Sequence, residues 1–86
     1  MDKEEKIKAM NNHLEQFKQM SFRAKARIER LAELSLVIED DLKFNSFADR
    51  VSELFGISNQ FEEQLEQLIN DYEIARNRVA LDEEPE

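Results

Sequence analysis

The chain has 86 residues, a formal net charge of -8, one Gly, one Pro, one His and neither Cys nor Trp. The missing cysteines exclude disulfides, thiolate metal sites and thiol nucleophiles, and a single Gly excludes the glycine-rich loops that cradle phosphates. Ala, Glu, Lys, Leu and Arg fill 42 positions, and 37% of the residues are charged, a bias typical of long helices. We therefore expect a small all-α protein that binds no cofactor.

The apolar content also bears on location. No stretch approaches the ~20 apolar residues that cross a bilayer, and residues 1–6 lack the apolar segment of a signal peptide. We expect a cytoplasmic protein without membrane insertion.

Apolar and small residues recur every three or four positions from about residue 3 to residue 42, which predicts one long N-terminal helix. These positions are Ile7, Met10, Leu14, Phe17, Ser21, Ala24, Ile28, Leu31, Ser35, Ile38 and Leu42. Near the end, Leu34, Leu36 and Val37 add a second apolar face, so burial on two sides is expected there.

A turn is expected at residues 43–46, because Asn45 and Ser46 can accept hydrogen bonds from the free amides of a helix start. Gly56 suits the positive φ that often ends a helix, and it predicts a break near Ile57 and a further helix at 60–81. The apolar positions of this second rod are Phe47, Val51, Leu54, Ser58, Phe61, Leu65, Leu68, Tyr72, Ala75 and Val79. Residues 1–81 are expected to form one domain, and residues 82–86 an acidic flexible tail.

The apolar positions of the second rod keep one heptad phase through Gly56, which favours an antiparallel helical hairpin over a reversal of the chain at Gly56. In the register that we expect, Ser35 lies beside Leu54, and Lys25 lies near Glu62. Two helices alone bury little surface, so a homodimeric four-helix bundle is the favoured architecture. A monomeric three-helix bundle that turns at Gly56 is the alternative.

Few residue patterns indicate chemistry. His13 is the only histidine, and no second histidine or Glu-x-x-His pair accompanies it to bind a metal. The serines lack the flanking glycines of a nucleophile elbow, and one His cannot serve as the base for any particular serine. We expect neither a metal site nor an enzyme.

Charge is distributed unevenly along the chain. Residues 1–30 carry eight Lys/Arg and five Asp/Glu, a net of +3, whereas residues 31–86 carry a net of -11. Arg23, Arg27 and Arg30 follow a helical spacing of four and three, which places them on one side of the first helix. The first half of the chain therefore offers a basic stripe and the second half a strongly acidic rod.

These features favour a non-enzymatic protein–protein interaction module that acts as a regulator, adaptor or inhibitor of a partner protein. The candidate partner-binding residues are apolar positions off the main stripe together with acidic positions of the rod. They are Phe22, Leu34, Val37, Phe55, Glu62, Glu66 and Ile69.

Two other functions are open at this stage. A dimeric hairpin with Arg23, Lys25, Arg27 and Arg30 on one face resembles in architecture the small plasmid copy-control proteins, and the resemblance implies binding of paired RNA loops. Alternatively, the carboxylates at 62–73 could imitate nucleic-acid phosphates. The short, acidic, cysteine-free helical chain also resembles small accessory proteins of bacteriophages, which implies lysis timing or anti-defence.

Overall fold

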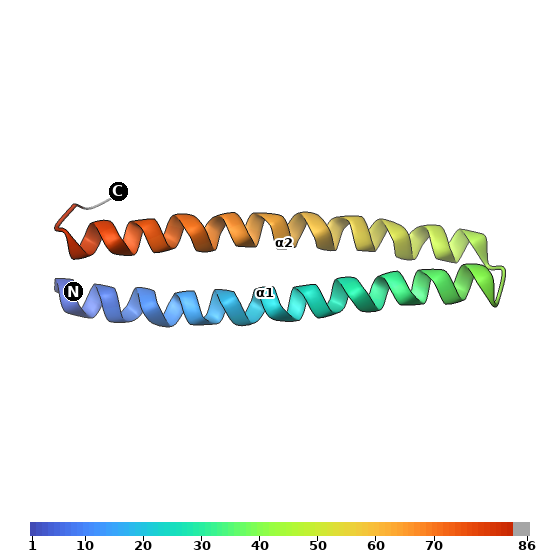
Figure 1. Cartoon of the computed structure of the whole chain (residues 1–86), viewed down its shortest axis with the longest axis horizontal. Coiled ribbons are helices and arrows are strands. Elements are labelled where there is room, and N and C mark those ends of the chain that lie inside the picture. The colour runs from blue at the N-terminus through green and yellow to red at the C-terminus, as the bar shows by residue number, and fades with distance from the viewer. Residues whose placement is uncertain (84–86) are drawn as a thin grey trace. The chain divides into compact units, whose positions relative to one another are not determined.

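The computed structural model describes residues 1–83 and contains two long helices (Figure 1). Helix α1 spans Lys3–Asp40, with 38 residues, and helix α2 spans Asn45–Ala80, with 36 residues. No strand occurs in this part of the chain. The fold is all-α and consistent with the predicted helical hairpin; the last three residues of the predicted tail, 84–86, lie outside the described residues.

The chain forms two compact units, and each contains parts of both helices. Unit 1 combines residues 1–21 with the segment from residue 64 onward, and unit 2 comprises residues 22–63. In unit 2 the end of α1 and the beginning of α2 are joined by the interhelical turn, so they run antiparallel (Figure 1).

The start of α1 is capped by side chains close to it in sequence. Asp2 Oδ1 accepts a hydrogen bond of 2.8 Å from the Glu5 amide, and the Asp2 carbonyl accepts one of 2.9 Å from the Lys6 amide. The side-chain bond satisfies an amide that has no partner within the helix, and the backbone bond is the first i to i−4 hydrogen bond of α1. Glu4 and Glu5 in the first turn also interact favourably with the positive end of the helix dipole.

Helix α1 ends at Asp40, two residues before the predicted end. Lys43 has a φ of 60°, and the Phe44 amide donates to the Ile38 carbonyl at 3.2 Å, which closes the turn. Helix α2 then begins at Asn45, inside the predicted turn segment. The reversal of the chain between the two helices is therefore confirmed at the expected place.

The end of α2 uses the same left-handed conformation. Asp82 has a φ of 60°, the Glu83 amide donates to the Arg78 carbonyl at 2.7 Å, and the Asp82 amide donates to the Val79 carbonyl at 3.0 Å. This pair of hydrogen bonds is a Schellman motif, with an Asp in the position that Gly usually occupies.

The predicted break near Gly56 is wrong. Helix α2 continues through Gly56 and Ile57, and Gly56 does not have a positive φ. The alternative three-helix bundle, which needs a reversal at Gly56, is wrong for the same reason. Tertiary context overrides the weak helix propensity of one Gly, whose cost is only about 1 kcal/mol relative to Ala.

The predicted stripe on α1 faces α2. Its members are buried or half-buried, with the exception of Leu42, which follows the helix end. Leu14, Ser21 and Ala24 are the most deeply buried among them. We call this line and its counterpart on α2 the seam.

The predicted stripe on α2 is correct at six of its ten positions. Val51, Ser58, Leu65, Tyr72, Ala75 and Val79 lie in the seam as expected. At the other four positions the seam residue is one later than predicted. These residues are Ala48, Phe55, Glu62 and Ile69, all buried or half-buried, whereas the predicted Phe47, Leu54, Phe61 and Leu68 are exposed.

The register within unit 2 also differs from the prediction. Ser35 Oγ lies 2.9 Å from Ser52 Oγ and donates to the Ala48 carbonyl at 3.3 Å, so Ser35 is not opposite Leu54. The expected proximity of Lys25 and Glu62 is confirmed, with 3.7 Å between Lys25 Nζ and Glu62 Oε1. The small residues Ser35 and Ala48 therefore meet at this end of the seam.

The Gly56→Ala variant is expected to be more stable than the wild type. An added Cβ meets no atom within 4 Å, and Ala is favoured over Gly inside a helix by about 0.5–1 kcal/mol. Thermal unfolding followed by circular dichroism should show an increase of a few degrees in Tm. A lower Tm would mean that Gly56 adopts a conformation that only glycine tolerates.

Leu65→Ala is expected to destabilise unit 1 by about 2–5 kcal/mol, because it empties a buried position of the seam. Ile74→Ala is the matched control, since Ile74 is in the same unit and is 45% exposed. Urea unfolding of both variants should separate them clearly. Equal losses of stability would contradict the seam described here.

Candidate interaction surfaces

The predicted partner-binding residues fall into two groups. Phe22, Leu34 and Val37 of α1 and Glu66 of α2 have exposed side chains. Phe55 and Ile69 are half-buried in the seam, and Glu62 is only 6% exposed. Phe22 is the most exposed of the apolar members at 76%. The structure therefore leaves the α1 members of the set on the surface and uses Phe55, Glu62 and Ile69 for packing within the chain.

Glu62 occupies an unusual position for a carboxylate. It lies in the seam of unit 2, with its Oε1 facing the Lys25 ammonium group, while the Lys25 side chain itself stays more than half exposed. A buried charge needs such a partner, because removal from water is costly. Glu62 and Lys25 are thus structural residues of unit 2.

Five of the exposed candidates on α1 form one stripe in unit 2, and Phe22 lies outside it. Arg23, Arg27, Arg30, Leu34 and Val37 follow one another at spacings of four and three, so they share one side of the helix. All five are exposed. This α1 stripe is basic in its first half and apolar in its second half, and it unites residues from the predicted protein-binding and RNA-binding sets.

Lys25 does not belong to the α1 stripe. Its ammonium group reaches toward Glu62, whereas Arg27 lines a groove with Ile57 and Phe61. The structure therefore separates Lys25 from the three arginines in the set predicted to bind RNA.

A second exposed surface lies on α2 and was assigned to the core by the sequence pattern. Phe47, Leu54 and Phe61 recur at intervals of seven residues, and each is about half exposed. We call these three residues the α2 row. A groove of about 490 Å³ runs beside Phe47 and Leu54, and a smaller one lies beside Phe61.

The α2 row is more apolar than the three neighbouring positions that face α1 in its place. Phe, Leu and Phe remain outside, while Ala48, Phe55 and Glu62 face α1. Helix α2 therefore carries two overlapping heptad lines that share Val51 and Ser58. The amino-acid sequence already indicates this second surface, because contact with one neighbouring helix cannot bury both lines.

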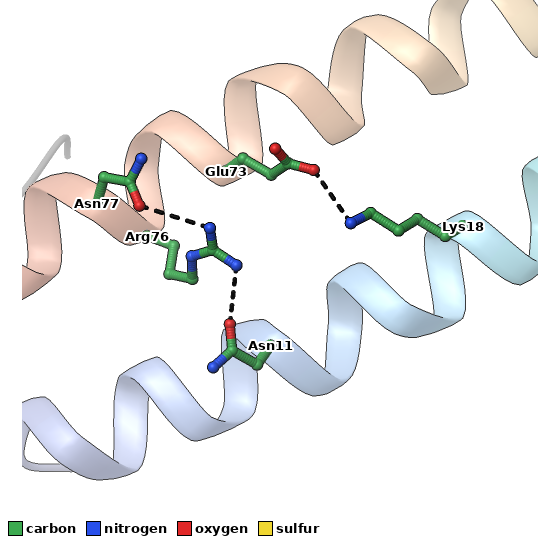
Figure 2. Close-up of polar contacts among 5 residues, drawn as sticks. All are labelled: Asn11, Lys18, Glu73, Arg76 and Asn77. Carbon is green, nitrogen blue, oxygen red and sulfur yellow. Dashed lines mark hydrogen bonds and ion pairs between the residues drawn. The ribbon is translucent and has the colours of Figure 1, made fainter.

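In unit 1 the two helices are also joined by polar contacts (Figure 2). Arg76 donates to Asn11 Oδ1 at 3.0 Å, and Lys18 Nζ lies 3.3 Å from Glu73 Oε1. His13 Nδ1 and Tyr72 Oη lie 2.7 Å apart. These side chains are exposed or half-buried, so each polar contact contributes little to stability.

Comparison with protein-family models, curated proteins and solved structures gives no match for this chain. Within residues 1–83, neither helix combines the length and the apolar character of a membrane-spanning segment.

Glu62→Leu is expected to stabilise the protein by about 1 kcal/mol or more, because an apolar side chain of similar size removes the need to bury a charge. Lys25 is already exposed and can return to water. Thermal unfolding checks the change in Tm, and Glu63→Leu, at a neighbouring exposed position, is the control. A fall in Tm with Glu62→Leu alone would show that the carboxylate is required in the seam.

Proposed function

We propose that the protein is a non-enzymatic interaction module, which regulates, adapts or inhibits a partner protein through the α1 stripe. The observation that supports this most directly is the amount of apolar surface left outside. Fifteen large apolar side chains are exposed among residues 1–83, whereas five apolar residues are buried. Apolar surface on this scale is typical of proteins that associate.

The chemistry of the α1 stripe suggests the kind of partner. Leu34 and Val37 suit an apolar helix face, and Arg23, Arg27 and Arg30 suit carboxylates beside it. A partner segment with apolar residues at one end and acidic residues at the other would match both halves of the stripe. The arginines at the edge would mainly speed association, and the apolar pair would hold the complex together.

RNA binding is the second candidate, because the three arginines lie exposed on one side of α1. It uses only the basic half of the stripe and leaves Leu34 and Val37 without a role. The two functions therefore respond differently to changes in the two halves.

The test is affinity capture from cells with four forms of the full chain: wild type, Leu34→Gln/Val37→Gln, Arg23→Gln/Arg27→Gln/Arg30→Gln, and Leu36→Gln. Leu36 is an exposed Leu of α1 outside the stripe, so the last variant is the matched control. We expect the Leu34/Val37 variant to lose its partner and the control to keep it. The arginine variant should keep it with slower binding, by less than about tenfold.

Nuclease treatment separates the two candidates. A complex that resists nuclease and depends on Leu34 and Val37 supports the protein partner. A complex that disappears with nuclease, and with the arginine variant alone, would replace the proposal with RNA binding. Capture that none of the variants changes would contradict a role for the α1 stripe.

A further inference from the structure

The α2 row remains exposed when the α1 stripe is assigned to a partner. We infer that a second copy of this chain covers it, with the α2 helices of the two copies crossing antiparallel at Leu54. This goes beyond the proposed function, because it concerns another helix and another occupant, although the two surfaces adjoin where Arg27 lines the groove beside Phe61.

The spacing of the α2 row suits such a symmetric contact. Phe47 and Phe61 lie seven residues before and after Leu54, so the row reads Phe, Leu, Phe in both directions. A two-fold interface is self-complementary, because each contact occurs twice. An antiparallel crossing at Leu54 pairs Leu54 with its own copy, and pairs Phe47 with Phe61 of the second copy.

The available area is sufficient for a dimer. Exposed apolar residues around the row are Leu42, Phe44, Phe47, Leu54, Ile57 and Phe61, each about half exposed. At roughly 100 Å² each, estimated from the size of aromatic side chains, they provide on the order of 600 Å² per copy. Two copies reach about 1,200 Å², the lower end of the range for specific interfaces.

The charges near the crossing predict how self-association depends on salt. Arg50, which lines the groove beside the row, is opposite Ser58 of the second copy, so the two Arg50 side chains do not meet. Glu53 is exposed one residue from the crossing point, so the two copies bring their Glu53 carboxylates to the same edge of the contact, and each chain carries a net charge of -8. Self-association should therefore strengthen as salt rises, because salt screens these repulsions.

An acidic partner on the row would show the opposite trend. Arg27 and Arg50 line the two grooves, and their attraction to carboxylates weakens with salt. Salt dependence thus distinguishes a second copy from an acidic occupant.

The first measurement is the mass of the wild-type chain by sedimentation equilibrium at several protein concentrations, at low and high sodium chloride. We expect twice the chain mass of 10.2 kDa, with a lower dissociation constant at high salt. Leu54→Glu should reduce the mass to one chain, and Leu36→Glu, on α1, should not. A single-chain mass for the wild type under all conditions would overturn the inference.

Cysteine cross-linking tests the crossing without disrupting the fold. The chain has no Cys of its own, and Leu54→Cys should form a disulfide-linked dimer on mild oxidation, because a disulfide needs Cα atoms about 4.4–6.8 Å apart. Phe47→Cys should cross-link with Phe61→Cys when the two are mixed, but not with itself. Equal cross-linking by Leu54→Cys and the control Leu36→Cys would overturn the crossing.

The two proposals fail separately. A chain that stays monomeric and still captures its partner through Leu34 and Val37 contradicts only the dimer. A dimer that captures no partner contradicts only the proposed function.

Discussion

A helix that packs against a single neighbour can bury only the residues on one side, and this limit on burial governs the rest of the structure. A helix in a hairpin can turn one side toward its neighbour, so each apolar position off that side stays exposed. None of the largest side chains in residues 1–83 is fully buried. Stability must therefore come from a narrow seam, and the remaining apolar surface is available for association with other chains.

The seam contains small and charged residues as well as apolar ones. Ser35 lies against Ala48 and near the exposed Ser52, so small residues take the seam positions near the turn. Further along, Glu62 takes a buried position with the help of Lys25. These residues bury less apolar area than the α2 row would. The helix pair thus combines a defined register with an exposed apolar surface on α2.

Much of the fold was predictable because the relevant signals are local. The long first helix, the turn near Asn45 and the seam of α1 follow from spacing and turn chemistry. The Lys25–Glu62 contact was also expected. The break predicted at Gly56 is wrong, because one Gly costs a long helix little. The residues of the α1 stripe were also predicted from the sequence, but as two separate sets, one basic and one apolar. Their common helical spacing places both sets on one side of α1.

The amino-acid sequence by itself determined the helices, the position of the turn and the side of α1 that faces α2, since each depends on neighbours a few residues away. The tertiary structure decided which of two overlapping lines on α2 enters the seam. Both lines have the same heptad spacing and share Val51 and Ser58, so periodicity cannot separate them. The choice depends on how α2 packs against Ser35 and Lys25 of α1, and it leaves Phe47, Leu54 and Phe61 at the surface.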